Sequence, residues 1–142
     1  MPQQNFRNHA RYVPIWHFIT PLLMLTAIAG SIIHFFHTEG KEQYMAGLLV
    51  LFSFTIVIIW GYARLFALRA QDRAIRAEEN LRHFVLTGRL HDSRLRLGQV
   101  IALRFAGDAE MPELAVRAVE EKLSPKQIKM LIGHWRPDYH RV

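Results

Sequence analysis

The chain has 142 residues, of which 51% are hydrophobic, with no cysteine and a formal net charge of +6 at pH 7. Without cysteine there can be no disulfide and no thiolate metal site, and the length allows a pair of membrane helices plus one small soluble domain. The excess of lysine and arginine favours an anionic partner, and anionic lipid is the nearest one to a membrane protein.

Two apolar runs without Asp, Glu, Lys or Arg occupy residues 13–36 and 45–63. Each supplies about the 20 residues that a helix needs to cross a hydrocarbon core of about 30 Å. The polar link 37–44, with Gly40 in a turn, is short enough to make the two helices antiparallel neighbours. Because the first run continues well beyond the small residues Ala27–Ala29 and a second run follows, we expect an uncleaved anchor rather than a signal peptide. The pattern predicts a transmembrane hairpin.

Basic residues flank this hairpin on one side. Two arginines precede the first run and four follow the second, whereas the link has a single lysine: Arg7 and Arg11, then Arg64, Arg69, Arg73 and Arg76, against Lys41. The positive-inside rule therefore places both termini in the cytoplasm, and in a bacterium the protein in the inner (plasma) membrane. We expect the four arginines after the second run to contact anionic lipid headgroups, with a simply solvated helix face as the alternative.

The C-terminal half is rich in helix-forming residues. No breaker occurs between Trp60 and Gly88, so the second run should continue as one helix to Thr87, with Gly88 as its C′ residue. Three shorter helices should follow. The first is capped by Asp92 or Ser93 and runs to about Ala106, the second is capped by Asp108, and the third begins at the capping box Ser124–Gln127.

The predicted fold class is all-α, with a two-helix transmembrane hairpin, a long continuous second helix and a small cytoplasmic helical domain. Small residues in Ala27–Ser31 should face Gly47 and Ser53 across the hairpin. On the long helix, Glu78 and Arg82 have the spacing of an (i, i+4) ion pair. The expected organisation is an N-terminal cytoplasmic tail, the first span, a periplasmic link, the second span, its cytoplasmic extension and a helical domain: 1–12, 13–36, 37–44, 45–63, 64–88 and 89–142.

Several short motifs extend over nearly the whole chain: Gln4–Arg11 (QNFRNHAR) leading into Val13-Pro14, Gln71–Arg82, Leu123–Lys129, and Trp135-Arg136 with Asp138-Tyr139. In these motifs the chain resembles an uncharacterised family of small two-span bacterial inner-membrane proteins. The resemblance implies the topology described above. It implies no activity and no functional residue.

Histidines near the ends of the first run suggest a second possibility. His34 and His37 are three residues apart on a helix, with Glu39 close by, and together they could ligate zinc or copper. His17 and His34 could each ligate a haem if a second copy supplied the opposite ligand. The alternative is that these are histidines at headgroup level. A small metal- or haem-binding membrane protein that uses His17, His34 and His37 is therefore the second hypothesis.

The sequence has no motif of an enzyme nucleophile, zinc hydrolase or phosphate loop, and the spans contain no ionisable residue other than histidine for transport. Acidic residues interrupt the basic helices, so no nucleic-acid partner is expected. Near the C-terminus, Trp135, Arg136 and Tyr139 form an aromatic–arginine group that suits a partner interface. The alternative is that Trp135 and Tyr139 complete a small core. We therefore predict a non-enzymatic membrane-anchored adaptor or accessory subunit, without cofactor, that binds a protein partner or a second copy.

Overall fold

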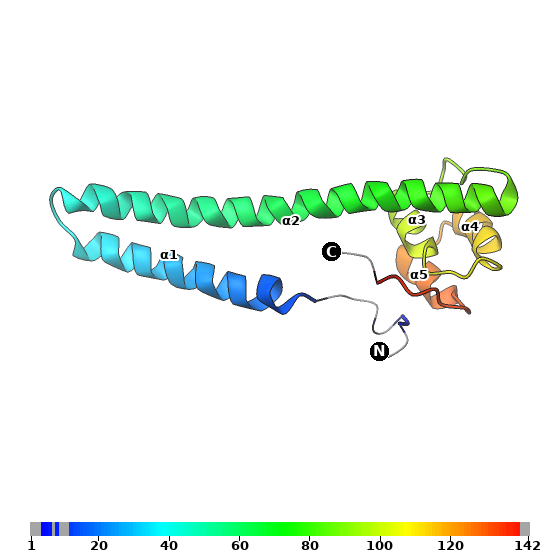
Figure 1. Cartoon of the computed structure of the whole chain (residues 1–142), viewed down its shortest axis with the longest axis horizontal. Helices are drawn as coiled ribbons and strands as arrows, with labels where there is room; N and C mark the ends of the chain where they lie inside the picture. The colour runs from blue at the N-terminus through cyan, green and yellow to red at the C-terminus, as the bar shows by residue number, and fades with distance from the viewer. Residues whose placement is uncertain (1–3, 7, 9–11, 140–142) are drawn as a thin grey trace. The chain divides into compact units, whose positions relative to one another are not determined.

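The computed structural model describes residues 4–6, 8 and 12–139. Its elements are a π-helical turn (η1) followed by five α-helices, α1 to α5: Ile15–Ile19, Thr20–His37, Glu42–Thr87, Leu97–Leu103, Met111–Glu120 and Pro125–Leu131 (Figure 1). The described residues contain no strand, only one isolated antiparallel bridge between Ala106 and Trp135. The predicted all-α class is confirmed.

The chain divides into two compact units. The first, here called the hairpin unit, comprises residues 12–66 of the described chain. The second, the helical unit, comprises residues 67–139 together with the N-terminal residues 4–6 and 8. The boundary lies inside α2, which is one unbroken helix of 46 residues. The predicted continuation of the second apolar run as a single helix is therefore confirmed.

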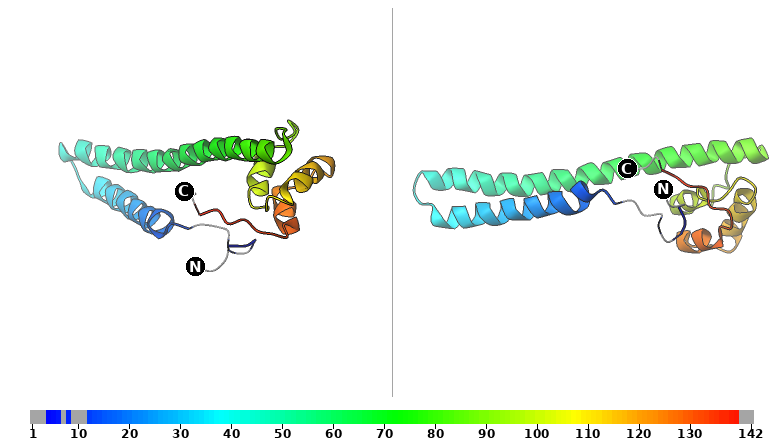
Figure 2. Two further views of the ribbon diagram at one scale, coloured as in Figure 1. Left: turned by 45° about the vertical axis from the view of Figure 1, so that its right-hand side comes forward. Right: turned by 60° about the horizontal axis from the view of Figure 1, so that its bottom comes forward.

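In the hairpin unit, α1 lies antiparallel to the first part of α2 (Figures 1 and 2). The two helices meet through a hydrogen bond from Ser53 Oγ to Ser31 Oγ at 3.3 Å and through the stacked rings of Trp16 and Trp60, with centroids 5.2 Å apart. The predicted proximity of Ser53 to the small-residue stretch is confirmed, whereas Gly47 lies against Phe35. The helix containing η1 and α1 and the helix α2 are each long and apolar enough to cross a membrane, by length and composition.

The start of the first helix departs from α geometry next to Pro21. Proline has no N–H to donate to the carbonyl one turn earlier, so the local ladder must be rearranged. Residues Ile15–Ile19 form a π-helical turn, and both the backbone N–H and the hydroxyl of Thr20 donate to the carbonyl of Ile15. Pro21 is accommodated by this wider turn, which Thr20 closes onto Ile15.

Helix α2 ends as its sequence predicts. Gly88 has φ +72°, and its N–H donates to the carbonyl of Phe84 at 2.7 Å. A residue with a Cβ is strained in this left-handed conformation, which explains a glycine directly after the helix.

In the helical unit, α3 contacts both α4 and α5, and the three gather beside the C-terminal part of α2 (Figure 2). Their shared core consists of apolar side chains that are almost fully inaccessible to water, the largest being Leu103, Met111, Val100 and Ile128. Phe105, directly after α3, is also fully buried, and α2 contributes the buried Ile75. This core gives the unit tertiary contacts of its own.

The three predicted short helices exist, but two of the predicted caps are wrong. Neither Asp92 nor Ser93 caps α3, which begins only at Leu97 with Arg96 as its N-cap. The carboxylate of Asp92 instead accepts the backbone N–H of Arg94 at 2.8 Å in a local turn. Asp108 does not cap α4, whose N-cap is Glu110. Aspartate satisfies turns as readily as helix starts, so its position alone cannot distinguish the two.

The capping box of α5 is confirmed. Ser124 Oγ accepts the backbone N–H of Gln127 at 3.3 Å, and Gln127 Oε1 accepts the N–H of Ser124 at 2.8 Å. Pro125 occupies the first helical position, where its missing N–H has no intrahelical partner to lose.

Candidate functional site

The C-terminal segment, residues 132–139, is bound to the turn that follows α3. The N–H of Arg136 donates to the carbonyl of Phe105 at 2.7 Å, and the N–H of Gly107 donates to that of His134 at 2.9 Å. The ring of Trp135 stacks on Phe105 with centroids 4.8 Å apart and planes inclined by 19°. Of the two alternatives for Trp135, the structure therefore shows packing, which fixes the residues that follow it.

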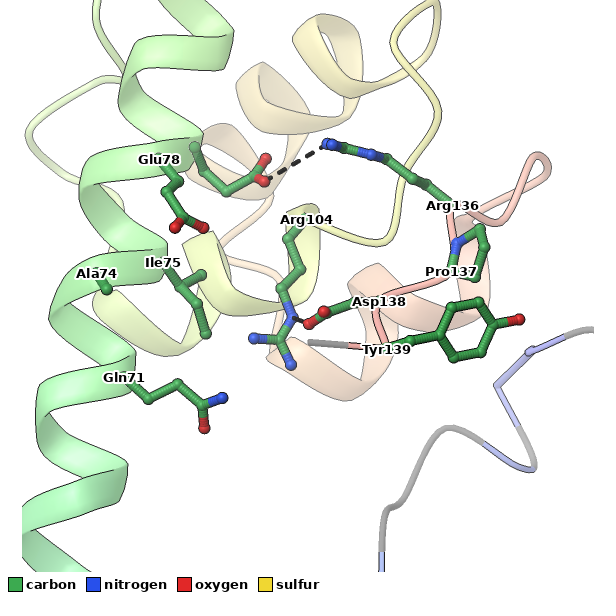
Figure 3. Close-up of a pocket in the computed structure, with 10 residues that line it drawn as sticks. Gln71, Ala74, Ile75, Glu78, Arg104, Arg136, Pro137, Asp138 and Tyr139 are labelled. Carbon is green, nitrogen blue, oxygen red and sulfur yellow. Dashed lines mark ion pairs between the residues drawn. The ribbon is translucent and has the colours of Figure 1, made fainter. Parts of the chain in front are cut away.

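A groove of about 490 Å³ lies between α2 and this segment (Figure 3). Four residues of the C-terminal segment and Arg104, at the end of α3, line it opposite α2. We call this feature the C-terminal groove; it is lined by Gln71, Ala74, Ile75, Glu78, Glu79, Arg104, Arg136, Pro137, Asp138 and Tyr139. Arg136 and Tyr139 are more than half exposed, so both can reach a partner.

Two ion pairs line the groove, one within the wall opposite α2 and one that joins this wall to α2 (Figure 3). Arg104 Nε lies 3.3 Å from Asp138 Oδ2, and Arg136 Nη1 lies 3.7 Å from Glu79 Oε1. Glu78, on the α2 wall, forms no hydrogen bond or ion pair with any residue that the structure describes. The groove therefore combines mutually paired charges with one carboxylate that is open to a ligand.

The α2 wall is held by Arg82, which lies just beyond the groove. Its guanidinium binds Glu79 Oε2 at 2.9 Å, Asp108 Oδ1 at 2.6 Å and the carbonyl of Ala106 at 2.7 Å. The predicted ion pair between Glu78 and Arg82 is therefore wrong, because Arg82 pairs with the neighbouring glutamate. Glu79 is buried and Glu78 is exposed, so only Glu79 can share with Arg82 the face that meets the rest of the unit.

Gln4 contributes to the site from the other end of the chain. Its side-chain Oε1 accepts the N–H of Asp138 at 2.7 Å, and its Nε2 donates to the carbonyl of Asp138 at 3.2 Å. Gln4 is buried. Its side-chain amide binds both the N–H and the carbonyl of one backbone residue, as a residue of a neighbouring β-strand would. The role of Gln4 could not be predicted, because the motif Gln4–Arg11 gives no indication of a partner 134 positions away.

The structure gives the positions of the predicted lipid-contacting arginines and does not test their contact with lipid. Arg69, Arg73 and Arg76 are exposed along α2, and none of them pairs with a carboxylate in the described residues. Arg64 is half-buried and belongs to the hairpin unit. Arg7 and Arg11, which the orientation argument also uses, lie outside the described residues. Lipid contact stays a prediction.

The three histidines of the metal and haem hypothesis each bond locally. His17 Nδ1 lies 2.9 Å from the carbonyl of Val13, His37 Nδ1 lies 2.8 Å from that of Ile33, and His34 Nδ1 lies 3.3 Å from Thr38 Oγ1. Within residues 4–6, 8 and 12–139, no group of three or more His, Asp or Glu side chains could hold a metal ion. The described part of the chain therefore brings no third ligand to His34 and His37, and the metal and haem hypothesis gains no support.

A second cavity, of about 340 Å³, is lined by two histidines, His83 and His91, whose ring centroids are 4.3 Å apart and whose planes are tilted by 35°. Both ring nitrogens of His91 are buried and have no hydrogen-bond partner in the described structure. Burial first, and then the nearby His83 and Arg82, lower the pKa of His91 from 6.5 to about 4.

This pKa predicts a pH-dependent stability. Because the neutral form of His91 is favoured by folding, its contribution is complete above pH 6.5 and is lost as the pH falls toward 4. Allowing for screening of a half-exposed ring, we expect about 1 kcal/mol to be lost between pH 7.5 and 5. Urea unfolding of the wild type and of His91→Phe at both pH values measures this loss of unfolding free energy. An equal pH dependence in the two proteins would contradict the prediction.

A family model described as a family of unknown function (DUF6526) matches residues 1–142, the whole chain. The chain belongs to this family. No curated protein and no solved structure matches the chain. The family description carries no activity, so the roles of individual residues depend on the geometry described above.

Proposed function

We propose that the protein is a non-enzymatic adaptor anchored in the bacterial inner membrane, whose helical unit binds a protein partner through the C-terminal groove. One observation carries the proposal. A groove with exposed Arg136 and Tyr139 belongs to a unit with its own core, and the helix that forms one wall of that groove, α2, continues into a long apolar segment.

Membrane insertion is supported by the two apolar helices. Each has the length and composition of a span, and their outer faces expose large apolar side chains such as Phe18, Leu22 and Ile58. In water such surfaces would drive aggregation, whereas hydrocarbon solvates them. The flanking arginines support an orientation with both termini in the cytoplasm, by the positive-inside rule.

Binding rather than catalysis is supported by the chemistry of the groove. Its lining contains no cysteine, serine, threonine, lysine or histidine, and the carboxylates of Glu79 and Asp138 are engaged in ion pairs. Acid–base or nucleophilic chemistry needs an activated group within reach of a second one. By contrast, arginine and tyrosine are among the residues that contribute most to protein interfaces.

Photo-crosslinking in living cells tests the proposal. We expect Tyr139→benzoylphenylalanine to give one discrete product with another protein chain, because Tyr139 lies at the edge of the groove. Adding Arg136→Glu should lower its yield several-fold, since the charge reversal repels a partner that binds Arg136. Tyr44→benzoylphenylalanine is the control, because Tyr44 is also a largely exposed tyrosine but lies at the start of α2, in the hairpin unit.

Crosslinking of Tyr139 to lipid alone, or an equal set of products from both positions, would contradict the assignment of the groove. Orientation is tested separately by fusing reporters after Val142. A reporter that is active only in the cytoplasm supports the proposed topology, and one that is active in the periplasm contradicts it.

A further inference from the structure

One exposed face of α2 in the helical unit has an apolar pattern that shares only Ala74 with the lining of the C-terminal groove. Apolar residues recur there at alternating intervals of three and four. We call these residues the α2 seam: Ala67, Ala70, Ala74, Ala77, Leu81 and Phe84. The 3-4 alternation is that of the a and d positions of a coiled coil, where the apolar edge faces a second helix and favours a left-handed supercoil.

The seam is not the face that packs inside the unit. On α2 the buried side chains are Ile75 and Glu79, whereas Leu81 is 64% exposed and Phe84 is 50% exposed. The seam alanines 70, 74 and 77 are exposed as well, and Ala67 is half-buried. Helix α2 therefore has two separate apolar faces, and other side chains of its own unit cover only one of them.

Charged residues beside the seam indicate what covers it. With Ala74 at a and Ala77 at d, Arg73 occupies a g position and Glu78 the following e position. In a parallel pair of helices, a g residue meets the e residue five positions later in the partner. Arg73 of each copy would therefore meet Glu78 of the other. Neither residue has an ion-pair or hydrogen-bond partner among the described residues.

The opposite arrangement lacks this complementarity. In an antiparallel pair, g positions meet g positions and e positions meet e positions, so Arg73 would gain no carboxylate from its neighbouring helix. Within a single helix the two residues are five positions apart and do not face each other. The charges therefore select a parallel neighbour with the same sequence.

We propose that the α2 seam is the interface with a second copy of this chain, in a parallel homodimer that forms a short left-handed coiled coil over residues 67–84. Alanines allow the two helices to approach closely, and Leu81 and Phe84 supply the larger apolar contact near the end. This inference rests on the proposed membrane topology in one respect, because insertion in one orientation keeps two copies parallel and concentrates them.

Cysteine crosslinking tests the proposal, since the chain contains no cysteine of its own. Single substitutions Ala70→Cys, Ala74→Cys, Ala77→Cys and Leu81→Cys are placed on the seam. Arg69→Cys and Arg76→Cys are matched controls on another exposed face of the same helix. A disulfide needs Cα atoms within about 7 Å, so oxidation of native membranes should yield dimers several-fold more efficiently from the seam positions.

Charge reversal tests the register in the Ala77→Cys background. Arg73→Glu and Glu78→Arg should each lower the dimer yield, and the two together should restore it. Equal crosslinking at seam and control positions, or none at any, overturns the dimer. Failure of the double reversal to restore the yield overturns the parallel register.

A labelling control distinguishes failure of the dimer proposal from failure of the proposed topology. A membrane-impermeant maleimide should label Ala77→Cys only after the cells are opened. Labelling of intact cells would contradict the cytoplasmic orientation. Correct labelling without seam crosslinks would overturn the dimer alone.

Discussion

Replacing Arg82 by alanine should lower the free energy of unfolding of the helical unit by about 3–5 kcal/mol, the cost of leaving a buried charge without its partner. Arg82 binds Glu79, whose side chain is 9% exposed, and it also binds Asp108 and the carbonyl of Ala106. Its loss leaves Glu79 with only Arg136, at 3.7 Å. The α2 wall of the groove should loosen as a consequence.

Urea unfolding of the full chain in detergent, followed by Trp135 fluorescence after replacing Trp16 and Trp60 by phenylalanine, measures this loss. Arg94→Ala is the matched control. Arg94 also binds a carboxylate, that of Asp92 at 2.6 Å, but both side chains are exposed, so no resolvable change is expected. If Arg82→Ala and Arg94→Ala unfold at the same urea concentration, the network around Glu79 does not stabilise the unit.

The second large effect is expected at Gln99, whose substitution by leucine should cost about 2–4 kcal/mol. Gln99 is only 3% exposed. Its Oε1 accepts the N–H of Arg96 at 2.8 Å, and its Nε2 donates to the carbonyls of Ala118 and Leu123 at 3.0 and 2.9 Å. One side chain thus joins the start of α3 to the end of α4. Leucine in its place would leave these three backbone groups without their hydrogen bonds to the side chain.

Gln127→Leu is the matched control for Gln99→Leu. Gln127 binds the N–H of the N-cap residue of α5 in the same way, but it is exposed, so its loss should cost only about 1 kcal/mol. The same unfolding measurement ranks the two variants. Equal losses would show that Gln99 acts only as a cap and does not join α3 to α4.

Two features of the chain could be predicted because they depend on neighbours in the sequence. The continuity of α2 and its end at Gly88 follow from helix propensity and from the left-handed conformation that glycine tolerates. The α5 capping box is formed within four consecutive residues. Both involve interactions that close within about one helical turn.

Other features required the fold. Spacing allows Arg82 to pair with Glu78 or Glu79, and only burial of one helix face selects Glu79, with Asp108 arriving from 26 residues away. Asp92 and Asp108 were predicted as helix caps, but aspartate suits a turn as well as a helix start. Only the tertiary structure shows which of the two occurs; for Asp92 it is a turn, and α3 begins later, at Leu97.

By itself, the sequence determined the all-α class, the two apolar helices and the long α2, because local propensity and hydrophobic periodicity specify them. The tertiary structure alone decided the C-terminal groove, where Gln4 meets Asp138, Arg104 meets the same aspartate and Trp135 stacks on Phe105. These contacts join residues that are distant along the chain. Many residues could satisfy each polar group, and only the packed core determines which of them comes within reach.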